Sequence, residues 1–212
     1  MPAPVSLLLA SSNTGKLREY RALTASSGFA ADLRLELIPG LDRLPEFAET
    51  APTFAENAIG KALHYSRLVL GLVFADDSGL VVPALGGAPG VHSARYAGPD
   101  RTSEQRIEKL LGELRGKAGE ERAACFVCTI ALAERGRALA VVTDRVDGQI
   151  LEAPRGKGGF GYDPVFFFPP LGKTFAELPP LEKNCYSHRG KAFRKLADFV
   201  LGPGGSSPKL TG

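Results

Sequence analysis

The chain has 212 residues, of which 44% are hydrophobic and 23% charged, a composition typical of a folded globular protein with one or two domains. Three cysteines are too few for a disulfide framework, and no run of eighteen apolar residues predicts a membrane span. The net charge of +3 is uneven, because residues 1–154 hold 17 Lys and Arg against 19 Asp and Glu, whereas residues 155–212 hold 9 against 4. This distribution favours a small phosphorylated substrate over a nucleic acid, whose groove needs a stronger basic stripe.

The first residues lack the basic segment and the apolar length of a signal peptide, and we expect a cytoplasmic protein. Strands and helices alternate early and a β-hairpin pattern follows, an order typical of an α/β protein with a mixed sheet. We expect one domain of two lobes over residues 1–200 and a disordered tail over 201–212. In the first half of the chain, the predicted elements are strands at 5–10 and 33–37 around a helix at 15–26, then a helix from 53 toward 71 and strands at 72–75 and 80–82. A loop at 86–100 follows, and a capping box at 102–105 opens the next helix. The rest of the chain predicts a hairpin of strands at 123–133 and 138–150, a strand at 165–168 and a helix at 189–201.

Two adjacent carboxylates, Asp76 and Asp77, follow the apolar strand segment LGLVFA and precede Ser78 and Gly79. A charge at the rim of a core is expensive unless a cation or a substrate accompanies it, so the pair predicts a site for a hard metal ion. If the strand persists, the two side chains point to opposite faces and have different roles. Glu49 and Glu56 could add carboxylates, although solvated surface charges are the alternative for both.

Three further segments are candidates for binding. SSNTGK, at residues 11–16, joins a strand to a helix N-terminus, where free N–H groups favour phosphate, although an ordinary capped helix fits equally well. GGFGYDP, at 158–164, offers close backbone approach and two aromatic faces for a planar base, or else a tight turn with aromatic core filling. EKNCYSHRG, at 182–190, offers Lys183 for a phosphate and His188 and Arg189 as donors to a purine, or else a basic helix start.

The Cys125–Cys128 spacing resembles a metal or redox motif, but both cysteines lie in a predicted strand. Side chains an odd number of residues apart in a strand point to opposite faces, so one metal ion could not easily bind both. We therefore expect core cysteines.

Taken together, the blocks SSNTGKLRE, FAENAIGKA, ADDSGL, LGGAPGVHSARYAG, GGFGYDPVFF and EKNCYSHRGKA resemble the inosine triphosphate pyrophosphatase family in their order along nearly the whole chain. The resemblance implies an elongated, two-lobed α/β fold around a long twisted mixed sheet, with flanking helices and an active-site cleft between the lobes. It also implies a homodimer that binds Mg²⁺ and a purine nucleoside triphosphate, with neither nucleic acid nor membrane as a partner.

The resemblance also assigns residues. Asp77 matches the catalytic proton acceptor and a magnesium ligand, and Glu49 matches the second metal carboxylate, although Ala48 stands where some members have another acid. Asp76 is left as a structural partner of Asp77. The substrate-binding residues that the resemblance implies are Ser11, Ser12, Asn13, Thr14, Gly15, Lys16, Ser78, Phe160, Gly161, Tyr162, Asp163, Lys183, His188 and Arg189.

The implied reaction is magnesium-dependent hydrolysis of noncanonical purine nucleoside triphosphates (ITP, dITP and XTP) to the monophosphate and pyrophosphate. A site built to satisfy a 6-oxo group would reject adenine, because the mismatched amino group leaves buried donors unpaired. Two alternatives are a related pyrophosphatase of the Maf kind that acts on modified pyrimidines, and a catalytically silent module that binds nucleotide or RNA. The acidic pair argues against RNA, since without metal it would repel phosphates.

Overall fold

The computed structural model describes residues 3–26, 29 and 31–202, and the tail expected to be disordered lies largely outside them. Its strands pair in the order β2-β1-β3-β4-β5-β6-β7. β1 is parallel to both β2 and β3, whereas β6 is antiparallel to β5 and β7, so the predicted mixed sheet is confirmed. The strands are β1 Val5–Leu9, β2 Leu33–Leu37, β3 Leu72–Val81, β4 Ala123–Glu134, β5 Arg137–Ile150, β6 Phe166–Phe168 and β7 Lys173–Thr174. The α-helices are α1 Thr14–Ser26, α2 Phe54–Ser66, α3 Ser103–Glu113, α4 Pro180–Tyr186 and α5 His188–Leu201.

The chain divides into two compact units, and β3, β4 and β5 contribute residues to both. Unit 1 comprises residues 1–77, 128–144 and 189–212, and unit 2 comprises residues 78–127 and 145–188. The expected elongated shape and the cleft between lobes stay predictions.

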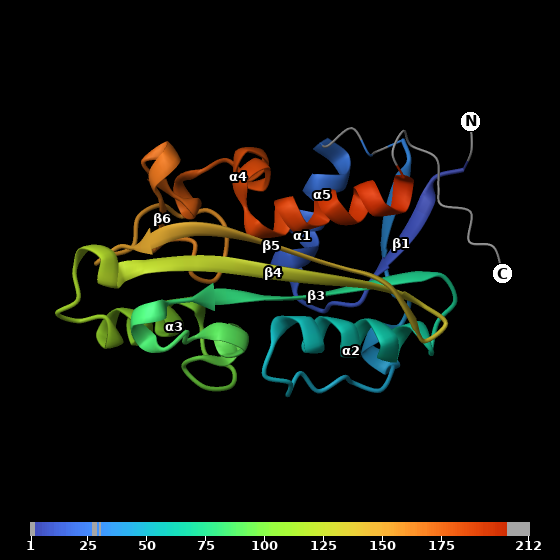
Figure 1. Cartoon of the computed structure of the whole chain (residues 1–212), viewed down its shortest axis with the longest axis horizontal. Coiled ribbons are helices and arrows are strands. Elements are labelled where there is room, and N and C mark those ends of the chain that lie inside the picture. Colours follow the sequence, from blue (N-terminus) through green and yellow to red (C-terminus); the bar gives the residue numbers. More distant parts are fainter. Residues whose placement is uncertain (1–2, 27–28, 30, 203–212) are drawn as a thin grey trace. The chain divides into compact units, whose positions relative to one another are not determined.

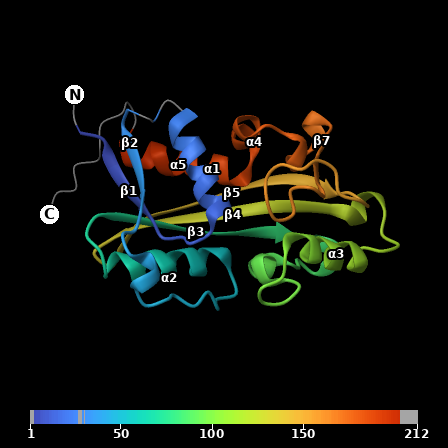
Figure 2. The same cartoon turned by 180° about the vertical axis from the view of Figure 1, so that it is seen from behind.

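In unit 1, the alternation of side chains along the strands builds two separate cores. Figure 1 shows α1 and α5 on one side of β3 and α2 on the other, and Figure 2 shows the same layers from behind, with β2 beside β1. Leu7, Leu9 and Phe74 pack toward α1 and α5. Leu8 and Val73, their neighbours in sequence, pack toward α2. The sheet of unit 1 is therefore covered on both faces, which explains why its strands read as continuous apolar runs.

Unit 2 has one core, formed by α3, the first part of β4 and the aromatic segment of β6. The capping box that opens α3 is present as predicted, with the Thr102 hydroxyl accepting from the Gln105 N–H and the Gln105 side chain accepting from the Thr102 N–H. Phe126, Phe166 and Phe175 pack ring against ring inside this core.

Three predicted boundaries need correction. β3 runs unbroken from Leu72 to Val81, so no acidic turn separates two shorter strands. α2 ends at Ser66, short of the expected limit, and the chain turns into β3 through Gly71 at a φ of +108°. The segment at 86–100, expected as a loop, contains a 3₁₀ turn at Gly90–Arg95.

The hairpin predicted at the β4–β5 junction is present, because two neighbouring strands joined by only two residues must run antiparallel. Arg135 and Gly136 both have positive φ, as the tight turn of such a hairpin requires. Cys128 on β4 is fully buried and Cys125 is only partly so, consistent with opposite faces, and both thiols are free. Among the described residues, none of the helices has the length and hydropathy needed to cross a bilayer.

Candidate active site

The loop before α1 is organised by its own polar side chains. The Ser11 hydroxyl accepts from the Asn13 N–H (3.2 Å), and the Asn13 side-chain oxygen accepts from the Lys16 N–H (3.0 Å). These bonds cap the N-terminus of α1, as Asn does at the position before a helix. Lys16 lies in the first turn of this helix, and its ammonium points back toward β3, where it donates to the Asp76 carbonyl (3.2 Å).

Asp76 is fully buried on the face of β3 that packs against α1 and α5. Its Oδ2 lies 3.0 Å from Lys16 Nζ and 3.5 Å from Arg189 Nε. Arg189 also forms an ion pair with Glu19. Burial alone would raise the pKa of Asp76, but Lys16 and Arg189 outweigh burial and hold the pKa below its usual value. Asp76 is therefore a paired, ionised carboxylate inside the protein.

Asp77 points to the opposite face of β3, toward α2, as strand alternation predicts. Only 5% of the residue is exposed, and its Oδ2 accepts from Asn57 Nδ2 (2.9 Å). Burial raises the pKa of Asp77 to about 6, against the opposing effects of Lys16 and of the Asn57 hydrogen bond. Glu49 and Asp76 contribute smaller increases to the same pKa. A cation placed at Asp77 would offset both the cost of burying its charged carboxylate and the repulsion by Glu49 and Asp76.

Glu49 lies in the loop before α2 and is held by Lys61 of that helix, with Nζ 2.6 Å from Oε1. Burial lowers the pKa of Lys61, but the adjacent Glu49 outweighs burial and raises it, so this lysine stays charged. Glu56, the other candidate acid, has a local role, since it exchanges hydrogen bonds with Thr53 at the start of α2. The structure thus links Glu49, but not Glu56, to the surroundings of Asp77.

In unit 2, Asp163 organises the GGFGYDP segment. Its Oδ2 lies 2.5 Å from Lys183 Nζ and accepts from the Phe160 N–H at 2.8 Å. Asp163 and Lys183 are 2% and 4% exposed, so this is a buried ion pair. Gly159 has a φ of +71°, and a Cβ there would lie 2.0 Å from Asp163 Oδ2, so only glycine fits. Lys183 also lies over the ring of Phe160, 5.2 Å from its centroid.

Two predicted binding residues of unit 2 have buried side chains. Tyr162 is 4% exposed and donates its hydroxyl to the Ser93 carbonyl (3.0 Å). Its ring therefore fills the core, as in the alternative considered for this segment, and offers no stacking face for a base. His188 is 4% exposed and stacks on Phe126 with ring centroids 4.7 Å apart.

The structure brings the predicted residues together as two groups. The group in unit 1 lies on both faces of β3, with Lys16 of the 11–16 loop and Arg189 against Asp76 on one face, and Asp77 and Glu49 toward α2 on the other. The group in unit 2 contains Phe160, Gly161, Asp163, Lys183 and His188, and the partly exposed Ser78 follows Asp77 on β3. Sequence reasoning left Asn57, Lys61 and Glu19 without roles, although all three contact the group in unit 1. The i, i+4 spacing of Asn57 and Lys61 places both on one face of α2, and this spacing could have indicated in the sequence that they contact the same site.

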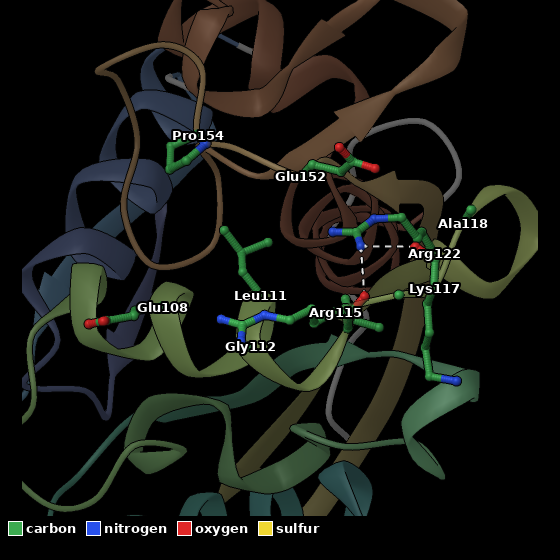
Figure 3. A pocket seen from close by; sticks show the side chains of 11 residues that line it. Glu108, Leu111, Gly112, Arg115, Lys117, Ala118, Arg122, Glu152 and Pro154 are labelled. Carbon is green, nitrogen blue, oxygen red and sulfur yellow. Dashed lines mark hydrogen bonds between the residues drawn. The ribbon is translucent and has the colours of Figure 1, made fainter.

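A cavity of about 720 Å³ lies beside α3 within unit 2, and none of the predicted site residues lines it (Figure 3). Arg122, a buried charged residue, lines this cavity. Its guanidinium donates to four main-chain carbonyls, and Figure 3 draws two of these hydrogen bonds. These carbonyls belong to Ile150 (2.6 Å), Leu151 (2.8 Å), Leu114 (3.0 Å) and Lys117 (3.3 Å). Because these bonds tie Arg122 to the backbone, it stabilises the fold of unit 2 and is not a candidate ligand-binding group.

Comparison with known proteins gives a consistent result. The model of the Ham1 family matches residues 7–199. A dITP/XTP pyrophosphatase of Geobacillus kaustophilus is 54% identical over 190 residues, covering 90% of this chain and 91% of its own. A dITP/XTP pyrophosphatase of Gloeobacter violaceus is 52% identical over 192 residues, with coverage of 90% and 91%. The solved structure of a HAM1 protein from Coxiella burnetii superposes with a TM-score of 0.79 at 43% identity, covering 91% of this chain and 96% of that one.

Proposed function

The chain belongs to the Ham1 family, and on that premise we propose that it hydrolyses noncanonical purine nucleoside triphosphates, dITP, XTP and ITP among them, to the monophosphate and pyrophosphate. The family and the hydrolase activity predicted from the motifs are confirmed by the matching relatives. The observation that carries the proposal is that Asp76 and Asp77, adjacent on β3, have different electrostatic surroundings. Asp76 is locked between Lys16 and Arg189, while Asp77, one residue later, is a buried carboxylate with a raised pKa.

The donor set at Asp77 fits Mg²⁺. This ion takes one or two carboxylates, keeps several waters and completes its shell with substrate phosphates. Asp77 and Glu49 are two such carboxylates, near enough for Glu49 to raise the pKa of Asp77. When bound, Mg²⁺ would offset charge on the triphosphate.

The residues of unit 1 would then act on the triphosphate. The loop from Ser11 to Lys16 would bind the phosphates, because it leads into the N-terminus of α1, whose helix dipole favours anions. Asp77 would orient or deprotonate the attacking water, since an ionised carboxylate beside the bound cation can accept a hydrogen bond or a proton from it. Hydrolysis of this kind depends mainly on positioning and charge neutralisation.

The residues of unit 2 would recognise the base. The partly exposed Phe160 offers a face for a purine ring, and its backbone is fixed by Asp163. His188 would supply a donor suited to oxygen at purine position 6, which inosine and xanthosine carry and adenine lacks, and Lys183 would contact a phosphate. Ser78 and Arg189 complete the proposed substrate-binding set. Homodimerisation and a cytoplasmic location stay predictions.

A panel of substrates tests the proposal. With Mg²⁺ present, we expect kcat/KM for dITP, ITP and XTP to exceed that for ATP by at least about a hundredfold, because a mismatched exocyclic group leaves buried donors unpaired. Pyrophosphate, not orthophosphate, should be the released product. A flat profile across these nucleotides would contradict the specificity, a preference for modified pyrimidines would favour the Maf-like alternative, and binding without turnover would favour a silent module.

Asp77→Asn tests the catalytic assignment. We expect hydrolysis of dITP to fall by at least about a thousandfold while the circular dichroism spectrum is retained, since the change removes a proton acceptor and a metal ligand together. Asp144→Asn is the control, because Asp144 on β5 pairs with Lys195 of α5 and has no assigned role in the site. Substantial activity in Asp77→Asn would rule out the assigned role.

A further inference from the structure

We infer that Asn57 is a positioning residue: its side-chain amide sets the place of the Asp77 carboxylate relative to the loop that carries Glu49. The inference rests on the proposed function, because it concerns the two carboxylates assigned to the cation. Asn57 lies in the first turns of α2, is 1% exposed, and contacts Asp77 on β3 as well as Ala51 in the loop before the helix.

All the hydrogen-bonding capacity of this amide is directed at those two partners. The Asn57 side-chain oxygen accepts from the Ala51 N–H (2.9 Å), and its Nδ2 donates both to the Ala51 carbonyl (3.2 Å) and to Asp77 Oδ2 (2.9 Å). A primary amide has two N–H donors and one carbonyl oxygen, so each of these groups has a partner.

The orientation of the amide is determined without reference to Asp77. The Ala51 N–H can only donate and the Ala51 carbonyl can only accept, so the oxygen of Asn57 must face the former and the nitrogen the latter. The second N–H of the nitrogen is then presented to Asp77. The loop thus sets the direction of the N–H that Asn57 donates to Asp77. The group facing this N–H must be a hydrogen-bond acceptor, as the Asp77 carboxylate is.

The same helix face controls the other carboxylate. Glu49 lies two residues before Ala51, in the loop that Asn57 binds at both of the Ala51 main-chain groups. One turn farther along α2, Lys61 holds the Glu49 carboxylate itself. A rigid helix therefore connects Asp77 to Glu49 through Asn57 and Lys61, and Asn57 is the member that reaches both the loop and Asp77.

Asn57→Leu tests the inference, because leucine has a similar size and none of the hydrogen bonds. Ser66→Ala is the matched control. Ser66 is also 1% exposed, lies at the other end of α2 about 13 Å away, and accepts a partly buried hydrogen bond from the Gly136 N–H, so Ser66→Ala also removes a side-chain hydrogen bond from α2. Mn²⁺ is the probe for the cation, since its binding to the free protein is measured directly by electron paramagnetic resonance.

We expect Asn57→Leu to weaken Mn²⁺ binding and to lower kcat for dITP at saturating Mg²⁺, each by about 10- to 100-fold, the range found when a residue supporting a metal ligand is removed. KM should change by less than about threefold, and Ser66→Ala should match the wild type in all three quantities. Mn²⁺ affinity and kcat within about threefold of the control would overturn the inference.

Folding of each variant is checked by circular dichroism and thermal unfolding. If Asn57→Leu does not fold, Asn57→Ala removes the same hydrogen bonds without filling the space, and its results replace those of the leucine variant. Failure of both to fold would assign Asn57 to the fold and overturn the inference. Absence of dITP hydrolysis in the wild type would instead contradict the proposed function, and the Mn²⁺ comparison would still test Asn57.

Discussion

The buried pair of Asp163 and Lys183 gives the sharpest test of how unit 2 holds its base-binding segment. Lys183→Met keeps the length of the side chain and removes its charge, leaving Asp163, 2% exposed, with the Phe160 N–H among its donors. Removing one member of a buried ion pair costs about 3–5 kcal/mol, because the other charge remains desolvated. We therefore expect the folding equilibrium constant to fall roughly a hundredfold to several-thousandfold.

The assay is urea unfolding followed by circular dichroism, with the m-value compared between variants. Lys117→Met is the control. Lys117 also lies in unit 2 and pairs with Glu121 at 3.2 Å, but their side chains are 29% and 58% exposed, so its loss should cost less than about 1 kcal/mol. Asp163→Asn combined with Lys183→Met removes both charges and should recover at least about 1 kcal/mol relative to the sum of the single changes.

Two results would refute this reasoning. If Lys183→Met were as stable as Lys117→Met, the pair would not be desolvated as its burial indicates. If the double variant lost the full sum of the two single losses, the two charges would not be coupled. KM for dITP, measured on the same proteins, should rise for Lys183→Met and stay unchanged for Lys117→Met.

Three further predictions concern particular packing features. In urea unfolding, Gly159→Ala should lower the free energy of unfolding by over about 1 kcal/mol more than Gly161→Ala does, because both glycines have positive φ but only a Cβ at 159 would meet Asp163. Equal losses in the two variants would contradict this. Arg122→Met should lower the free energy of unfolding by at least about 3 kcal/mol in the same assay, because four main-chain carbonyls, two of them in buried hydrogen bonds, lose a charged donor. A loss under about 1 kcal/mol would show that water replaces the guanidinium. Burial raises the pKa of Cys128 to about 12, so at pH 8 it stays a protonated thiol. Cys128 should therefore react with Ellman's reagent only after unfolding, whereas the exposed Cys185 of α4 should react in the folded protein. Reaction of Cys128 in the folded protein would contradict this.

Much of the fold was predictable because its signals are local. Short apolar runs identified most of the strands and the capping box identified the start of α3, since both signals depend on residues a few positions apart. Boundaries were less predictable. The sequence predicts separate strands at 72–75 and 80–82, yet β3 continues through the acids at 76 and 77, because Lys16 and Arg189 supply the charge that Asp76 needs in order to be buried.

By itself, the sequence determined the family, the reaction class and the divergence of Asp76 from Asp77, because motif order and strand alternation are properties of the chain alone. The tertiary structure decided which groups surround each carboxylate. Lys16, 60 residues before Asp76, is brought to it by the packing of α1, and Asn57 is brought to Asp77 by the packing of α2. The protonation and orientation of a buried acid depend on such neighbours, and neighbours distant in sequence are fixed only when the helices pack on the sheet.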